Sequence, residues 1–108
     1  MTESIQIQLR KGALDLCVLA LLSRRESYAY EIASTLSAAV GMGEGTIYPL
    51  MRRMQKEGLV ETRLVETSSG PSRKYYRLTE AGRQAFERHR RDWQAFVGAV
   101  DRLLGQDP

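Results

Sequence analysis

The chain has 108 residues, 43% of them hydrophobic and 27% charged, which leaves room for one compact domain and one further element. This balance excludes a disordered chain, and the single cysteine, Cys17, excludes a disulfide framework and a four-cysteine metal site. The net charge of +3 is compatible with a nucleic-acid partner, but only the distribution of the charge can point to one.

The N-terminal residues 1–8 are polar and carry no helix cap, so we expect a flexible arm there. The longest apolar stretch, residues 13–22, contains Asp15 and is about half as long as a membrane-spanning helix. The N-terminus also lacks the pattern of a signal peptide. We therefore expect a cytoplasmic protein with no membrane partner.

Residues 9–24 have the spacing of an amphipathic helix with two apolar stripes. A helix that is apolar on two faces is normally covered on both, so one stripe predicts a contact with the chain's own core and the other a further partner. Cys17 belongs to an apolar stripe, which favours a buried and unreactive thiol. The two stripes are Leu14, Cys17, Val18 and Leu21, and Ala13, Leu16 and Ala20.

Two shorter helices are expected next. Ser27 is a plausible N-cap for a helix that ends near Ala39, with Tyr28, Ile32 and Leu36 on its inner face. Three glycines then interrupt the chain, at positions 41, 43 and 45. Because proline is favoured only in the first helical turn, Pro49 predicts a third helix that begins near Gly45 or Thr46. Gly58 ends this helix, and its inner face is formed by Ile47, Leu50, Met51 and Met54.

The pattern changes to that of a β-hairpin after Gly58. Val60, Thr62 and Leu64 alternate with charged residues, as in a strand with one buried face. Residues 67–72, TSSGPS, form a turn, and residues 73–78 form the return strand. In that strand Tyr76 and Leu78 are expected on one face, with Tyr75 and Arg77 on the other.

Thr79 can cap a last helix that extends to about residue 104. Its apolar residues follow one another at alternating steps of three and four, as in a coiled coil. A domain of this size is too small to bury such a helix alone, so the seam predicts a homodimer to which Leu16 also contributes. The seam consists of Phe86, His89, Trp93, Phe96, Val100 and Leu103.

The order of these elements predicts an α+β, mostly α fold. Residues 9–79 form a winged helix-turn-helix domain, residues 80–104 a dimerisation helix and residues 105–108 a tail. Winged helices bind DNA or protein, and the outward face of the third helix favours DNA. Further cations lie in the hairpin and at the start of the first helix, namely Arg63, Arg73, Lys74, Arg10 and Lys11. The third helix presents Thr46, Tyr48, Arg52, Arg53 and Lys56.

Catalytic functions fit the sequence poorly. His89 is the single histidine, and no metal-ligand spacing, nucleophile motif or phosphate-binding glycine loop surrounds it. We therefore expect neither an enzyme nor a cofactor. The alternative function is a winged-helix adaptor that binds protein, for which an apolar or acidic third helix would be expected.

Two segments of the sequence resemble the PadR family of transcriptional regulators. They are EGTIYPLMRRMQKEGLV at 44–60 and RKYYRLTEAGR at 73–83. The segments LRKGALDLCVLALL at 9–22 and YEI at 30–32 extend the resemblance over nearly the whole chain. The single C-terminal helix is similar to the smaller subfamily that includes multidrug-responsive repressors. The resemblance implies a homodimeric repressor that binds a pseudo-palindromic operator.

The resemblance also implies roles for single residues. Tyr48 would contact DNA with support from Arg52 and Lys56, while Arg73 and Lys74 would place the wing. Tyr30 matches a family tyrosine close to the DNA backbone, although Ala29 stands where a glycine commonly precedes it. The full DNA-binding set is Lys11, Tyr30, Gly45, Thr46, Tyr48, Arg52, Arg53, Lys56, Arg73 and Lys74.

Trp93 corresponds to the tryptophan that flanks a ligand pocket between the subunits of drug-binding members. Two symmetry-related indoles could hold a planar aromatic ligand by stacking, with Phe96 and His89 beside them. The alternative is that Trp93 only packs in the seam and that His89 is a simple core histidine.

Overall fold

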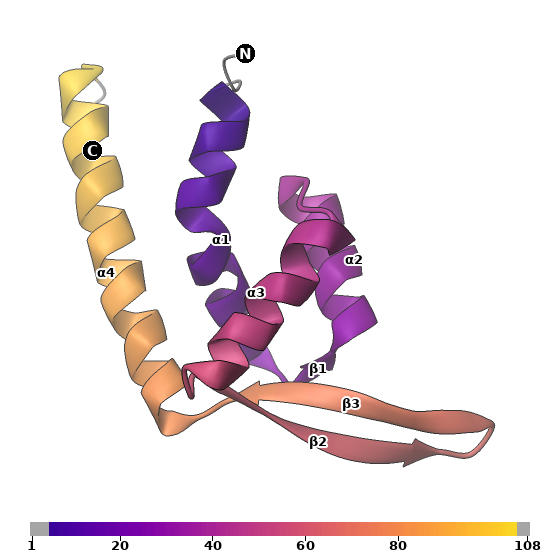
Figure 1. Cartoon of the computed structure of the whole chain (residues 1–108). Helices are drawn as coiled ribbons and strands as arrows, with labels where there is room; N and C mark the ends of the chain where they lie inside the picture. The colour runs from indigo at the N-terminus through magenta and orange to yellow at the C-terminus, as the bar shows by residue number, and fades with distance from the viewer. Residues whose placement is uncertain (1–4, 106–108) are drawn as a thin grey trace.

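The computed structural model describes residues 5–105, with the backbone alone for residues 5–8 and 10–12. Figure 1 shows α1 between the long α4 and the pair α2 and α3, while the hairpin projects from the base of the helices. The fold is therefore the predicted winged helix-turn-helix with a long last helix. None of its helices within residues 5–105 has both the length and the apolar character needed to cross a membrane. The elements are α1 (Ile5–Arg24), β1 (Ser27–Tyr28), α2 (Ala29–Val40), α3 (Glu44–Lys56), β2 (Val60–Thr67), β3 (Gly70–Leu78) and α4 (Glu80–Leu103).

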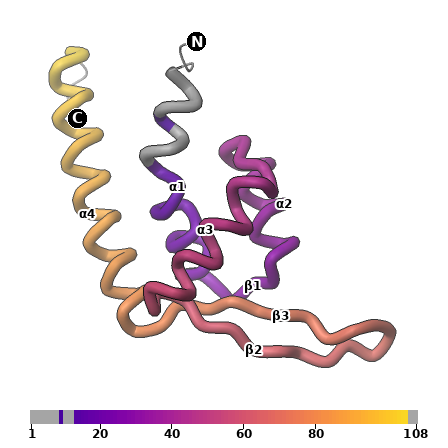
Figure 2. Tube along the Cα trace, in the orientation of Figure 1, coloured from indigo at the N-terminus to yellow at the C-terminus, as the bar shows by residue number. Residues whose placement is uncertain are grey.

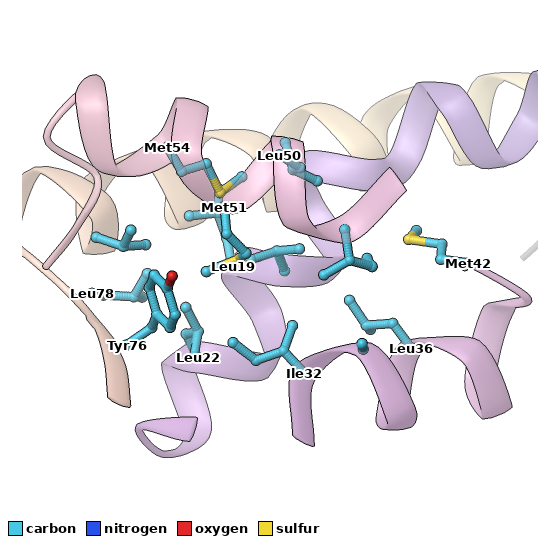
Figure 3. Close-up of a cluster of buried hydrophobic side chains, with 14 of the residues drawn as sticks. Leu19, Leu22, Ile32, Leu36, Met42, Leu50, Met51, Met54, Tyr76 and Leu78 are labelled. Carbon is cyan, nitrogen blue, oxygen red and sulfur yellow. The ribbon is translucent and has the colours of Figure 1, made fainter. Parts of the chain in front are cut away.

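The hydrophobic core lies where the three short helices meet the base of the sheet. Figure 3 shows side chains of α1, α2 and α3 converging there with Tyr76 and Leu78 of β3. The predicted inner face of α3 is confirmed, because Ile47, Leu50, Met51 and Met54 are all buried. Burying these four side chains determines which face of α3 turns outward. The other core residues are Val18, Leu19, Leu22, Ile32, Ala33, Leu36, Met42, Val60 and Ala85.

The short strand β1 replaces the predicted start of the second helix. Ser27 is buried and pairs with Tyr76 of β3, so it is not the N-cap. The cap position belongs to Tyr28, whose backbone N–H donates to Oε1 of Glu31 at 3.2 Å. Ser27 has the intrinsic preference of a cap, but the edge of the sheet offers its backbone a ladder of hydrogen bonds instead.

The hairpin is longer than its turn-forming sequence indicates. β2 and β3 extend over Thr67 and Gly70, which leaves a tip of two residues instead of the predicted six-residue turn. The pairing shifts between Val65 and Thr67, so the β3 segment that contains Pro71 carries an irregularity. A bulge tolerates proline, which cannot donate to a ladder. The hydroxyl of Thr67 donates to the carbonyl of Gly70 at 2.9 Å and closes the tip.

Two helix starts differ from the sequence prediction. α1 begins at Ile5, so the predicted arm is wrong for residues 5–8, and residues 1–4 lie outside the described part. Ile5 to Gln8 include no glycine or proline to stop the helix. α3 begins at Glu44, which places Pro49 in the second turn. Because Pro49 has no N–H, the carbonyl of Gly45 lacks its helical hydrogen-bond partner. Gly45 is exposed, so water can replace that partner. Gly58 follows α3 with φ +79°, as predicted.

The start of α4 is fastened to the core. Its N-cap is Thr79, as predicted, and the hydroxyl oxygen accepts from the N–H of Gly82 at 3.0 Å. The same hydroxyl donates to the carbonyl of Gly58 at 2.6 Å. Gly82 and Ala85 are buried, so the first turns of α4 pack against the winged helix. Beyond them α4 continues beside α1, and Figure 2 shows both helices leading away from the hairpin.

Candidate nucleic-acid interface

The outward side of α3 is a strip opposite its buried face. Gly45, Pro49, Arg52 and Lys56 follow one another at steps of four, three and four, so they share one side of the helix. All four are exposed. Within the described residues, no ion pair engages Arg52 or Lys56. The strip thus has no polar or charged side chain at its N-terminal end, where Gly45 and Pro49 lie, and is cationic toward its C-terminal end.

Thr46, Tyr48 and Arg53 lie on the flanks of this strip. Thr46 is exposed and Tyr48 is half-buried, so both are within reach of a ligand that covers the N-terminal half of α3. Arg53, in contrast, forms ion pairs with carboxylates of the chain itself. Its Nη2 donates to Oδ1 of Asp15 in α1 at 2.7 Å, and its Nη1 donates to Oε1 of Glu57 at 3.1 Å. The structure therefore separates Arg53 from Arg52 and Lys56, with which the sequence grouped it.

Arg73 and Lys74, the two cations predicted to place the wing, point to opposite faces of the sheet. Lys74 pairs with Leu64 on the face that carries Tyr76 and Leu78 toward the core. Arg73 lies on the other face, where its guanidinium stacks over the ring of Tyr28 at 4.5 Å. Leu64 was predicted to share the inward face with Val60, yet it is exposed because the hairpin extends beyond the core.

Besides the stacking of Arg73 on Tyr28, a second contact joins the wing to the rest of the protein. Arg63 donates through Nε to Oε2 of Glu26 at 3.0 Å, and its Nη2 contacts the other carboxylate oxygen. This hydrogen bond lowers the pKa of the Glu26 carboxyl. Arg77 pairs with Glu61 at 3.1 Å on the same sheet face. The charges of Arg63 and Arg77 are therefore compensated within the chain.

Tyr30 is exposed at the start of α2. It lines a shallow groove that runs along α2 to the first residue of α3. The groove is lined by Tyr30, Ala33, Ser34, Ser37, Ala38 and Glu44. Four of these residues, Ala33, Ser34, Ser37 and Ala38, have small side chains. Lys11 belongs to α1, but its side chain lies outside the described residues.

The sequence reasoning missed the carboxylates that engage the arginines. Glu57 follows Arg53 by four residues, a spacing at which side chains on a helix meet, so this pair could have been predicted from the sequence. Asp15 and Glu26 carried no such signal because they are remote from Arg53 and Arg63 in the chain. Among the described residues, the cations of α3 and the wing that have no carboxylate partner are Arg52, Lys56, Arg73 and Lys74, and of these Arg73 stacks on the ring of Tyr28.

The far part of α4 carries a row of apolar side chains that are partly or largely exposed. Exposed fractions are 42% for Trp93, 65% for Phe96 and 88% for Leu103. Val100 is half-buried, and His89 is exposed. Phe86 differs from the rest of the predicted seam, because it packs against the chain's own core. We refer to Trp93, Phe96, Val100 and Leu103 as the α4 apolar face. Leu16 of α1, the other predicted dimer contact, is half-buried.

Cys17 is half-buried in α1 rather than fully buried as expected. Burial raises the pKa of its thiol, which favours the protonated and less reactive form.

Comparison with known proteins matches both the sequence and the fold. Residues 18–88 match the transcriptional regulator PadR-like family. A PadR-like transcriptional regulator from Bacillus cereus is 40% identical, with a TM-score of 0.82 over 90% of this chain and 96% of that one. A PadR family transcriptional regulator from Eggerthella lenta is 32% identical, with a TM-score of 0.79 over 91% of this chain and 87% of that one.

A protein of uncharacterised function from Lysinibacillus sphaericus is 28% identical over 98 residues, which cover 87% of this chain and 90% of that protein. The two solved relatives are transcriptional regulators. The family match covers well over half of the chain, and the TM-scores of 0.82 and 0.79 show that the fold is shared. The chain belongs to the PadR-like family of transcriptional regulators.

Proposed function

We propose that the protein is a homodimeric repressor that binds a pseudo-palindromic DNA operator through α3. The observation that carries this proposal is the outward strip of α3, where Arg52 and Lys56 are exposed and unpaired within the described residues. A recognition helix approaches base edges with its N-terminal end, and cations farther along it contact phosphates. The bare N-terminal end and cationic C-terminal end of the strip suit this division.

The wing and α2 support the same docking. Lys74 lies on the sheet face that continues from the core, and Tyr30 lies beside the start of α3. A duplex laid along the outward strip would have a cation of the wing on one side and the polar surface of α2 on the other. Both contacts would be to the DNA backbone, which positions a protein without reading sequence.

The direct test is selection of an operator from a randomised duplex library, followed by binding measurements at several salt concentrations. We expect a two-fold symmetric sequence and an affinity that falls steeply with salt. In a deletion strain, transcripts from the genes that carry this sequence should rise. Failure to enrich any sequence at moderate salt would contradict the proposal, and a fall of those transcripts would indicate an activator.

Replacing Gly45 with alanine should separate DNA binding from stability. A Cβ at this position meets no atom within 4 Å, so the folded chain has space for it. Alanine is the better helix former, and we expect a gain of about 0.5 kcal/mol in the free energy of unfolding. The added methyl group lies on the outward strip and should weaken operator binding by about tenfold, because the backbone can no longer approach the groove as closely.

Thermal unfolding and fluorescence anisotropy with the selected operator measure the two effects of Gly45→Ala. Gly98→Ala in α4 is the matched control, since its Cβ meets only the side chain of Arg102 at an ordinary distance of 3.6 Å. It should raise stability and leave DNA affinity unchanged. Unchanged operator affinity in Gly45→Ala would place the duplex away from this end of α3.

The proposed homodimer rests on the α4 apolar face, because large aromatic side chains exposed in line on one helix are typical of an interface. We expect Trp93→Ala with Phe96→Ala to raise the dimer dissociation constant by at least about a hundredfold. Analytical ultracentrifugation over a range of concentrations measures this shift. Gln94→Ala, on the exposed opposite side of α4, should leave the dimer intact. A double variant that stays fully dimeric would place the interface elsewhere.

We also propose that a planar aromatic ligand binds between the two copies of Trp93 and releases the operator. Trp93 is the single tryptophan of the chain and is partly exposed, so its fluorescence reports directly on this position. Titration with a panel of planar aromatic compounds should quench the emission by stacking on the indole. The same compounds should weaken operator binding. Emission that responds to none of them in the intact dimer would mean that Trp93 only packs.

A further inference from the structure

Arg53 is the cation of α3 whose charge is satisfied within the chain. Its guanidinium donates to Asp15 of α1 at 2.7 Å and to both carboxylate oxygens of Glu57, at 3.1 and 3.3 Å. Two carboxylates thus face one guanidinium. The hydrogen bond with Asp15 is the main cause that raises the pKa of Arg53, and the bonds with Glu57 add to it. A phosphate that approached Arg53 would have to displace these partners or be repelled by them.

The position of Asp15 in α1 accounts for this contact. Asp15 precedes Val18, Leu19 and Leu22 at helical spacing, so it continues the buried stripe of α1 by one turn toward α3. The side chain of Asp15 remains 34% exposed, so its carboxylate is only partly withdrawn from water and is stabilised by a cationic partner. Arg53 provides this partner from a helix 38 positions away in sequence. We refer to this contact as the Asp15–Arg53 bridge.

The Asp15–Arg53 bridge joins two elements with different roles. α3 carries the outward strip, whereas α1 packs beside α4, which carries the α4 apolar face (Figure 1). Among the described residues, this bridge is the polar side-chain contact between α3 and α1. The bridge therefore adds a polar link between α3, whose outward face is set by its buried side chains, and the helices proposed to form the dimer.

We infer that Asp15 and Arg53 are positioning residues, which hold α3 at the angle to α1 that DNA binding requires, and that Arg53 is not a phosphate contact. The inference rests on the proposed function. It gives the two neighbouring arginines of α3 separate roles, because Arg52 faces the DNA backbone and Arg53 faces the protein. In a dimer, the angle held by the bridge in each subunit sets the orientation of both recognition helices toward the two half-sites.

The test is a double-mutant cycle in operator binding with Asp15→Asn, Arg53→Gln and the double variant. Each is measured with the full-length chain and the selected operator at several salt concentrations, after thermal unfolding has shown that it is folded. Arg52→Gln serves as the reference for a lost phosphate contact. Arg83→Gln serves as a neutral control, because Arg83 is exposed on α4 and pairs only loosely with Glu80 at 3.6 Å.

We expect Asp15→Asn and Arg53→Gln each to weaken operator binding by about threefold, as for the loss of one exposed ion pair. The double variant should bind no more weakly than either single variant, because both changes break the same bridge. All three should keep the salt dependence of the wild-type chain, whereas Arg52→Gln should reduce the slope of log affinity against log salt by about two, one unit for each subunit of the dimer.

The inference is overturned if Arg53→Gln reduces the salt slope as Arg52→Gln does, or if Asp15→Asn binds as tightly as wild type or more tightly. Either result would mean that Asp15 only competes with phosphate for Arg53. Both outcomes presuppose that the wild-type chain binds its operator, so they leave the proposed function standing. A wild-type chain that binds no duplex would overturn the proposed function and this inference together.

Discussion

Replacing Arg52 and Lys56 together with glutamine is expected to reduce operator affinity by about a hundredfold at moderate salt. Both side chains are exposed on the outward strip of α3 and unpaired within the described residues, so their charges are available to phosphates. Each lost phosphate contact removes about one unit from the slope of log affinity against log salt. A dimer loses two such contacts per substituted position, so the double variant should show a slope lower by about four.

Stability should change little in this variant, because neither side chain contributes to the core. Arg83→Gln with Arg88→Gln is the charge-matched control. Both residues are exposed on α4, and the substitution lowers the net charge by the same amount. If the control loses as much affinity as the α3 variant, the DNA is held by the overall charge of the protein and not by this helix.

Gly82→Ala is expected to lower the free energy of unfolding by about 3 kcal/mol, at the upper end for overpacking in a core. A Cβ at Gly82 would overlap the backbone carbonyl oxygen of Leu59 and lie 3.2 Å from Cδ2 of Leu78. The Leu59 carbonyl cannot yield easily, because it also accepts from the N–H of Thr79 at 3.1 Å. Glycine is therefore required where the start of α4 crosses the turn between α3 and β2.

Chemical denaturation at one fixed protein concentration measures this effect, since the stability of a dimer depends on concentration. The Gly98→Ala variant of the same helix is again the matched control and should be slightly more stable than wild type. Because the clash would push α4 away from the wing, Gly82→Ala should also weaken operator binding in the fraction that remains folded. Wild-type stability in this variant would contradict the close approach of α4 to Leu59.

Most of the architecture could be predicted from the sequence because its causes are local. The spacing of Ile47, Leu50, Met51 and Met54 determines the buried face of α3, whatever else the chain does. Gly58 and Thr79 mark the end of one helix and the start of another through their own backbone and hydroxyl chemistry. These features depend on residues within one or two turns of each other.

β1 and the true length of the hairpin could not be predicted in this way. Ser27 and Tyr28 become a strand only because β3 offers them an edge to pair with. Thr67 and Gly70 extend the hairpin because the register shift lies at Pro71, which cannot donate to the ladder, so pairing resumes beyond it. At these residues, strand pairing with segments distant in the sequence outweighed the local preference for helix caps and turns.

The role of each cation was likewise decided by the tertiary structure. The sequence determined that α3 has a basic outward side, but it could not distinguish Arg52 from Arg53 or Arg73 from Lys74. Asp15 and Glu26 reach Arg53 and Arg63 across 38 and 37 positions of sequence, and only the packing of α1 and the placement of the hairpin bring them together. An ion pair forms where two side chains meet in space, so periodicity predicts which face carries charge, and packing decides which of those charges remain available to DNA.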